Sequence, residues 1–430
     1  MSTEHTPNPT PAAEEPPPTA RLLPAALLVG GLAGSASALF LISLDWVSAR
    51  RLETPGLLWG LPAAGLLMAF VYRAFGKNSD RGNNLLLDQI HQPRAGVPRR
   101  MAPLVLASTL LSHLCGASVG REGTAVQMGG SLASAAARGL RLSPGALPSV
   151  LQCGMAAGFG SVFGTPLAGA LFALEVPRRG GLHGRAWMPL LVASFTGDLV
   201  CRAWGATHTA YTTLPFPGAD STAGLLVLLG KVILAGGLFG LLGAGFVRLT
   251  HGIQSLFGRW IRLWWLRPLA GGSLVLAMAG LLGTRDYLGL GVSHPDPAAI
   301  TLQSAFTQGG ATTWSWLWKM LFTALSLGSG FKGGEVTPLF FIGAAAGNTM
   351  ASALSAPTPL CAALGFISVF CGAAHTPLTG ALLGAELFGW QCVPWFLLSC
   401  WTAHRLCGSA QLYAAQRPSL PTPPPAPPTS

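Results

Sequence analysis

Long stretches of this chain are apolar and carry no charge. No Lys, Arg, Asp or Glu occurs in five runs: 22–44, 54–72, 101–119, 142–174 and 337–385. A helix needs about 20 such residues to cross the hydrocarbon core of a bilayer. The pattern therefore predicts several membrane-spanning helices and an all-α, multi-pass membrane protein.

Composition and charge agree with this prediction. Half of the residues are hydrophobic and only 10% are charged, against about a quarter in soluble domains. The net charge of +11 would elsewhere suggest nucleic acid, but the arginines are scattered between the apolar runs. We interpret them as loop and interface charges and expect no nucleic-acid partner.

The two ends and the cysteines suggest no further chemistry. Residues 1–20 are acidic and Pro-rich without the features of a cleaved signal, and 417–430 are Pro-rich, so both are predicted to be disordered tails. The eight cysteines lie in or beside apolar runs and show no C-x-x-C spacing. We expect them to be core residues, with no disulfide, metal or cofactor.

Glycine is unusually frequent, with 56 copies, many of them inside the apolar runs beside Ala and Ser. Small residues let membrane helices approach closely, and Gly and Pro also interrupt helices. The pattern predicts a dense bundle that contains broken or re-entrant helices.

The chain also contains an internal repeat. "TPLAGALFALE" at 165–175 returns as "TPLTGALLGAE" at 376–386, an offset of 211 residues, and "GREGT" at 120–124 pairs with "GGEVT" at 333–337, an offset of 213. Transporters build binding sites near the bilayer midplane from the helix ends of such halves. We assign a first transmembrane repeat to 21–250 and a second to 251–416.

Glu122 begins an apolar stretch directly after Gly120 and Arg121. An ionisable group inside a membrane protein is a functional candidate, and a helix N-terminus stabilises an anion. The Glu122 carboxylate and a free anion would therefore compete for one place, and protonation of Glu122 would admit the anion. A helix cap or an ion pair with Arg121 explains the same spacing equally well.

Three segments resemble the CLC family of chloride channels and anion/proton antiporters. "GREGTAVQMGG" at 120–130 is similar to the family's G-R-E-G-P signature, whose glutamate is the external gate. "GSGFKGGEVTPLFFIGAAAG" at 328–347 is similar to its G-x-F-x-P region, and "CGSAQLYAAQ" at 407–416 to its C-terminal segment with a Tyr facing the central anion. The resemblance covers about residue 24 to residue 416.

This resemblance implies a fold of two inverted repeats with roughly eighteen broken, tilted and re-entrant helices. It also implies a homodimer with one pathway per subunit, in the plasma membrane (the bacterial inner membrane).

Departures from the family pattern point to one branch of it. Asn83 stands where chloride-selective members have the serine of G-S-G-I-P, Thr124 replaces the signature proline, and Val336 and Thr337 replace a common Phe-Ala pair. These departures are similar to the fluoride-exporting branch. The resemblance therefore implies a proton-coupled antiporter that exports fluoride in exchange for H⁺, with fluoride and protons as its ligands and the lipid bilayer as its surroundings.

Fluoride needs a site rich in hydrogen-bond donors. Moving a small ion into a dry interior costs on the order of 20 kcal/mol unless donors replace its water. Asn83 offers an amide, while Thr337 and Tyr413 offer hydroxyl groups. With the resemblance, the predicted site comprises the gating and proton-transfer residue Glu122 and the anion-binding residues Asn83, Gly123, Val336, Thr337 and Tyr413. As alternatives, Asn83 caps a helix, Thr337 bonds to its own helix, or Tyr413 anchors the interface.

Chloride/proton exchangers of the family carry a second, inner glutamate directly after the repeated helix. Here Glu175 is followed by Val176, so that group is absent at this position. We expect the remaining acidic residues Glu175, Glu335 and Glu386 to be structural groups at helix ends.

Chloride transport, an intramembrane enzyme and a membrane receptor without transport are the alternative functions. A CLC chloride/proton antiporter or chloride channel would share the gate. An enzyme is not expected, because the apolar runs contain neither an H-E-x-x-H metal pair nor a G-x-S-G nucleophile setting.

Overall fold

The computed structural model describes residues 19–184, 187–215 and 221–418, and this part of the chain is helical, without a strand. The tails predicted at 1–20 and 417–430 fall almost entirely outside these residues. Fifteen α-helices and six short 3-10 or π turns are described, fewer α-helices than the eighteen expected, and the all-α prediction is confirmed. The helices are α1 (Thr19–Glu53), α2 (Leu61–Val71), α3 (Asn83–His91), α4 (Met101–Leu114), α5 (Glu122–Gly139), α6 (Leu147–Phe163), α7 (Pro166–Glu175), α8 (Trp187–Ala203), α9 (Thr222–Trp260), α10 (Leu266–Leu282), α11 (Ser315–Ser329), α12 (Val336–Ala353), α13 (Thr358–Ala374), α14 (Pro377–Phe388) and α15 (Val393–Leu406).

Several helices are long and apolar enough to cross a membrane. Four such segments occur among the described residues: Leu22–Glu53, Pro55–Arg81, Pro144–Phe163 and Thr222–Trp260. The longest charge-free runs divide further, because 142–174 forms α6 and α7 and 337–385 forms α12, α13 and most of α14. Hydrophobic length alone therefore underestimates the number of helices.

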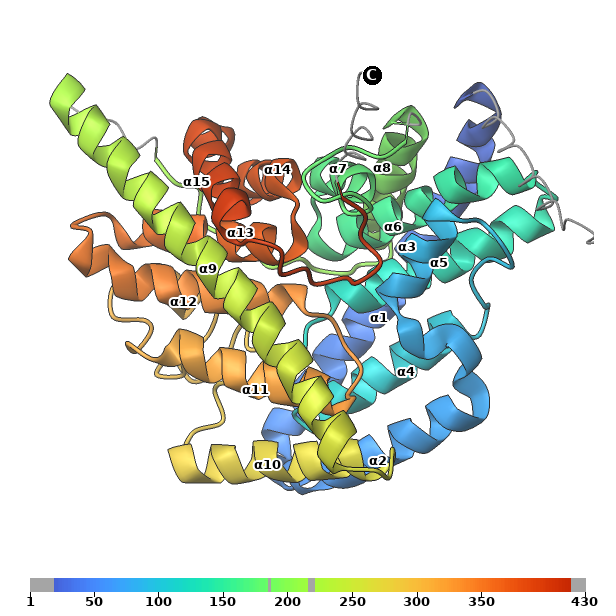
Figure 1. The fold of residues 1–430 in the computed structure, drawn as a ribbon, viewed down its shortest axis with the longest axis horizontal. Coiled ribbons are helices and arrows are strands. Elements are labelled where there is room, and N and C mark those ends of the chain that lie inside the picture. The colour runs from blue at the N-terminus through green and yellow to red at the C-terminus, as the bar shows by residue number, and fades with distance from the viewer. Residues whose placement is uncertain (1–18, 185–186, 216–220, 419–430) are drawn as a thin grey trace, which may run out of the picture.

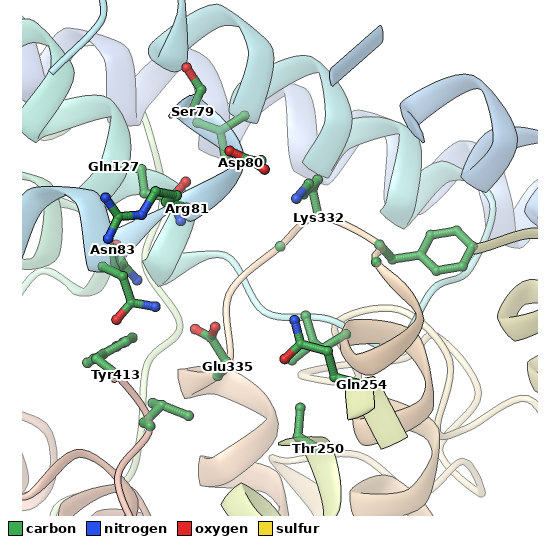
Figure 2. Close-up of a pocket in the computed structure, with 18 of the residues that line it drawn as sticks. Ser79, Asp80, Arg81, Asn83, Gln127, Thr250, Gln254, Lys332, Glu335 and Tyr413 are labelled. Carbon is green, nitrogen blue, oxygen red and sulfur yellow. The ribbon is translucent and has the colours of Figure 1, made fainter. Parts of the chain in front are cut away.

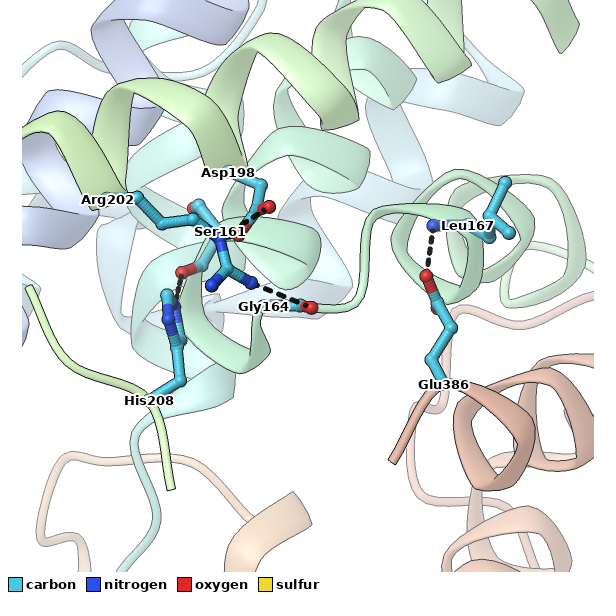
Figure 3. A network of polar contacts seen from close by, with 7 residues as sticks. All are labelled: Ser161, Gly164, Leu167, Asp198, Arg202, His208 and Glu386. Carbon is cyan, nitrogen blue, oxygen red and sulfur yellow. Dashed lines mark hydrogen bonds and ion pairs between the residues drawn. The ribbon is translucent and has the colours of Figure 1, made fainter. Parts of the chain in front are cut away.

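The breaks within these runs have local causes. Gly164 ends α6 with a φ of 72°, a conformation that glycine adopts without steric cost, and Pro166 then opens α7. His375 ends α13 at a φ of 56°, and Pro377 opens α14 in the same way. The first break is tied to α8, where Arg202 donates to the Gly164 carbonyl at 3.3 Å (Figure 3).

Two pairs of helices that contain or adjoin the repeated motifs have equal lengths. Helices α5 and α12 each have 18 residues, and α6 and α13 each have 17. Figure 1 shows the first half on one side of the molecule and the second half on the other, with the long α9 crossing in front. Because α9 runs without a break from Thr222 to Trp260, residue 250, our predicted boundary, lies inside a helix.

Paired glycines bring the matching helices together. Gly129 of α5 and Gly154 of α6 face each other so closely that a Cβ on either would collide with the carbonyl of the other. Gly343 of α12 and Gly365 of α13 repeat the same contact in the second half. Small residues at such crossings allow close van der Waals packing where lipid supplies no hydrophobic driving force.

Helices α7 and α14 cap each other with glutamates. Glu386, near the end of α14, accepts from the backbone N–H groups of Leu167 (3.0 Å) and Ala168 (2.7 Å) at the start of α7 (Figure 3). Glu175, at the end of α7, accepts from the N–H and the hydroxyl of Thr379, both at 2.7 Å. The predicted helix-end roles of Glu175 and Glu386 are confirmed, and each carboxylate joins one repeat to the other.

Removal of either cap should destabilise the fold. We expect Glu175→Ala and Glu386→Ala to lower the free energy of unfolding by about 1–3 kcal/mol each, because buried N–H groups lose their acceptors. Thermal unfolding of the purified protein in detergent measures this loss. The control is Glu53→Ala, which removes an exposed ion pair with Arg50. Equal melting temperatures for Glu53→Ala and Glu175→Ala would contradict the reciprocal capping.

Candidate functional site

The loops that open α5 and α12 pair at the junction of the two repeats. The Gly120 N–H donates to the Gly334 carbonyl at 2.6 Å, and the Gly334 N–H donates back to the Gly120 carbonyl at 2.8 Å. A Cβ on Gly334 would lie 2.7 Å from the backbone nitrogen of Gly123. Glycine is thus required for this approach, which brings the starts of α5 and α12 into contact.

The Glu122 carboxylate lies on the start of α12, in the opposite repeat. Glu122 is fully buried. One oxygen accepts from the Thr337 N–H at 3.0 Å and from the Arg121 N–H at 3.2 Å, and the other accepts from the Thr337 hydroxyl. Arg121 Nε lies 3.6 Å from that second oxygen. Glu122 therefore pairs with Arg121 while it accepts from the N-terminus of α12, and competition with a free anion stays a prediction.

Thr337 and Thr124 explain two of the departures in the sequence. The Thr337 hydroxyl donates to Glu122 and not back to its own helix. The Thr124 hydroxyl lies 2.7 Å from that of Thr109 in α4, a contact that a proline in its place would lack. Val336 begins α12 and is buried beside these residues.

Little space remains around the carboxylate on the side away from the loops. A void of about 10 Å³ is lined by Glu122 and Thr337 together with the rings of Tyr211 and Phe340. A single water needs roughly 10–15 Å³ of such volume. The carboxylate and the aromatic rings therefore close this side.

A larger cavity of about 230 Å³ lies on the other side of the paired loops (Figure 2). Asn83 at the start of α3, Glu335 before α12 and Tyr413 after α15 line it. The carbonyl oxygen of Asn83 and one carboxylate oxygen of Glu335 are buried and have no hydrogen-bond partner among the described residues. Such orphaned atoms cost about 1–3 kcal/mol each, so they call for water, a proton or another ligand in the cavity.

Gly123 separates the two spaces. A Cβ at this position would lie 3.1 Å from the Gly334 Cα, 3.3 Å from a Glu335 carboxylate oxygen and 3.4 Å from the Asn83 amide nitrogen. Gly123 thus lies against Asn83 and Glu335, which line the cavity, while the adjacent Glu122 occupies the closed site. The adjacent residues Glu122 and Gly123 thus lie between the closed site and the cavity.

The predicted site residues form two adjoining groups. Glu122, Thr337 and the buried Val336 lie at the start of α12. Asn83 and Tyr413 line the cavity, and Gly123 lies against Asn83.

Glu335 is the residue whose position the sequence did not predict. We expected a structural group at a helix end, yet its side chain makes no capping hydrogen bond to α12 and points into the cavity near Asn83 and Tyr413 (Figure 2). The available signal was the repeat, which pairs Glu335 with Glu122.

Charged groups of both signs line the cavity. Lys332 and Arg81 line it, with Asp80 as the other acidic residue besides Glu335 (Figure 2). Arg81 forms an ion pair with Asp88, and the Lys332 ammonium lies 4.5 Å from the centre of the Tyr72 ring. The two cations and two carboxylates leave the lining without an excess of either charge.

Comparisons with known proteins identify the family. The family model described as voltage gated chloride channel matches residues 64–408. A chloride/fluoride channel protein of Pseudomonas syringae pv. tomato is 44% identical over 407 residues, which cover 93% of this chain and 87% of the relative. An H(+)/Cl(-) exchange transporter of Yersinia pseudotuberculosis is 26% identical, covering 91% of this chain and 86% of that protein.

Solved structures show the same architecture. The crystal structure of a CLC-type fluoride/proton antiporter superposes with a TM-score of 0.87 at 32% identity, covering 93% of this chain and 98% of that one. A slow cyanobacterial Cl⁻/H⁺ antiporter shares the fold, with a TM-score of 0.72 at 19% identity and coverage of 90% and 94%. The chain described here is a membrane protein of the voltage-gated chloride channel (CLC) family.

Proposed function

We propose that this protein is a fluoride/proton antiporter that exports fluoride across the bacterial inner membrane. The observation that carries the proposal is the Glu122 carboxylate, which already occupies an anion position on the N–H and hydroxyl of Thr337. The 44% identical chloride/fluoride channel protein and the structural likeness to a CLC-type fluoride/proton antiporter support the choice of ion.

The exchange follows from competition for these donors. A carboxylate oxygen and a fluoride ion are both compact acceptors of charge-assisted hydrogen bonds. When Glu122 takes up a proton it loses its negative charge, leaves the start of α12 and frees the Thr337 donors for fluoride. When it loses the proton it displaces the anion, so that a proton and a fluoride ion are exchanged through one side chain.

Selectivity for fluoride rests on the number of donors. Fluoride holds its water more tightly than chloride, so a site that accepts it must replace more hydrogen bonds. Thr337 supplies two donors, and the Asn83 amide and the Tyr413 hydroxyl border the cavity along the same route. We infer that Asn83 and Tyr413 replace the water of fluoride before it reaches Thr337.

Glu335 is our candidate for the group that transfers protons on the cavity side. Val176 is buried where exchangers carry their inner glutamate, so another acid must serve. One oxygen of the Glu335 carboxylate has no partner and lies beside Gly123, the neighbour of Glu122. We propose that Glu335 exchanges protons with water in the cavity.

A proton gradient provides the driving force for export. Neutral hydrogen fluoride enters through lipid and dissociates in a less acidic cytoplasm, so the ion accumulates unless it is exported.

We also propose a homodimer, as the family resemblance implies. The exposed apolar side chains of α8 and α15, Phe195, Leu199, Leu397 and Trp401, fit contact with lipid or with a second copy.

The alternative is chloride/proton exchange or a chloride channel, which would use the same gate. We favour fluoride over this chloride-transport alternative because three residues depart from the pattern of chloride-selective members: Asn83, Thr337 and Val176. Transport of both ions decides between the two functions.

Replacement of Glu122 should uncouple anion transport from proton transport. We expect wild-type protein in liposomes to move fluoride in preference to chloride, with H⁺ moving in the opposite direction. Glu122→Gln cannot exchange a proton, so proton movement should be lost. Ion-selective and pH electrodes record both fluxes. Glu53→Gln, an exposed change, should behave as wild type; wild-type movement of chloride as fast as fluoride would favour the alternative function.

Loss of the Asn83 amide should weaken selectivity. We expect Asn83→Ser to reduce the ratio of fluoride to chloride transport by about tenfold or more, since a hydrogen bond to a charged group contributes about 1.5–3 kcal/mol. Asn78→Ser, at an exposed position, is the matched control. A ratio unchanged by Asn83→Ser would remove Asn83 from the site.

A methyl group at Gly123 should obstruct the pathway. Gly123→Ala would press on Gly334, Glu335 and Asn83, and such overpacking costs about 1–3 kcal/mol. We expect fluoride efflux to fall by about tenfold, as 1.4 kcal/mol corresponds to one such factor. Gly139→Ala on the same helix α5 meets nothing within 4 Å and should transport normally. Equal efflux by the two variants would contradict the assigned route.

A further inference from the structure

Three side chains with metal-ligand chemistry meet outside the anion route, although the sequence predicted no metal role for the cysteines. His375 follows α13, and His404 and Cys407 lie at the end of α15. The Nδ1 atoms of the two histidines are 3.3 Å apart, and Cys407 Sγ lies 3.6 Å from His375 Nδ1. One ligand atom from each residue lies within 4.8 Å of the other two.

The fold holds each of these residues in place. His404 and Cys407 are three residues apart, one helical turn, so their side chains share a face. His375 adopts the left-handed conformation, with φ 56° and ψ 43°, and its carbonyl accepts from the Gly180 N–H at 3.0 Å. The trio therefore comes from two helix ends that the fold brings together.

A hydrogen bond to a backbone carbonyl fixes the tautomer of His375 that can bind a metal ion. Its Nε2 lies 2.7 Å from the Ala410 carbonyl oxygen, which only accepts hydrogen bonds, so Nε2 carries the hydrogen. Nδ1 is then left with a lone pair directed at His404 and Cys407. Metal-binding histidines commonly donate their other N–H to a carbonyl in this way.

We propose that His375, His404 and Cys407 bind a thiophilic transition-metal ion of the zinc type, with water as a fourth ligand. Tetrahedral zinc has Zn–N bonds of about 2.0–2.1 Å and Zn–S bonds of about 2.3 Å, which place two nitrogens about 3.3 Å apart and a nitrogen and a sulfur about 3.6 Å apart. The observed separations of 3.3 and 3.6 Å match both values. Binding deprotonates Cys407, and its proton passes to solvent.

Access and charge set the expected strength of binding. His404 is half-buried, and Gly408 and Ser409, which follow Cys407, are exposed, so an ion can enter from the surface. Guanidinium groups of Arg179 and Arg248 lie near Cys407 and oppose a dication. The Cys407 thiolate offsets one of these positive charges.

The site adjoins a wall of the anion cavity. Ala410, which bonds His375, lies three residues before Tyr413, and the Leu412 N–H donates to the Ala373 carbonyl at 3.0 Å. A bound ion would therefore fasten the segment 407–416 to the end of α13. The proposal does not depend on which anion is transported.

Cobalt titration tests the site. Reduced, chelator-treated, full-length protein in detergent is titrated with Co²⁺, and the thiolate-to-cobalt charge-transfer band and the visible bands of tetrahedral cobalt are recorded. We expect one equivalent per chain, displaced by Zn²⁺. Cys407→Ala and Cys407→Ser should lose the thiolate band, and His404→Ala should weaken binding by about tenfold or more.

The controls are Cys361→Ala and His294→Ala, at positions outside the cluster. Both variants should bind Co²⁺ as the wild type does. Size-exclusion profiles identify any variant that fails to fold, and the half-buried His404 offers the mildest change. The proposal would be overturned by a wild-type protein without a thiolate band. A band that persists in folded Cys407→Ala would equally overturn it.

Discussion

The hydrogen bonds between the Glu122 carboxylate and the start of α12 are the interaction on which the rest depends. A helix begins with N–H groups that lack partners inside the helix, and in a buried place these groups need an acceptor. Here the acceptor comes from the opposite repeat and carries a charge that one proton can remove. In the exchange that we propose, stability and transport therefore use the same donors.

The architecture places helix ends at the centre of the molecule. Left-handed residues followed by proline break the long apolar runs in both halves, at Gly164 and at His375. Glycine pairs hold the resulting short helices in contact, and the carboxylates of Glu175 and Glu386 bind the ends that lie away from the gate. A closed void on one side of Glu122 and an open cavity beyond Gly123 result from this arrangement.

Sequence reasoning reached the fold class and the repeat, because charge-free runs and recurring motifs are local signals. It placed the repeat boundary at residue 250, inside α9, because arginines around that position suggested a loop although the helical pattern continues through them. Thr337 and Glu122 were both predicted, but their contact across repeats is a property of the fold. Glu335 was read as a helix-end group because spacing does not distinguish a cap from a cavity wall, and the His375, His404 and Cys407 cluster has no continuous motif.

The most direct test is the proton balance of fluoride binding. Fluoride is added to weakly buffered wild-type protein near neutral pH, and the pH change and the heat of binding are recorded together. Competition for the Thr337 donors predicts proton uptake that accompanies each fluoride bound, and no uptake in Glu122→Gln. Fluoride binding by the wild type without proton uptake, or with the same uptake in Glu122→Gln, would contradict the shared site.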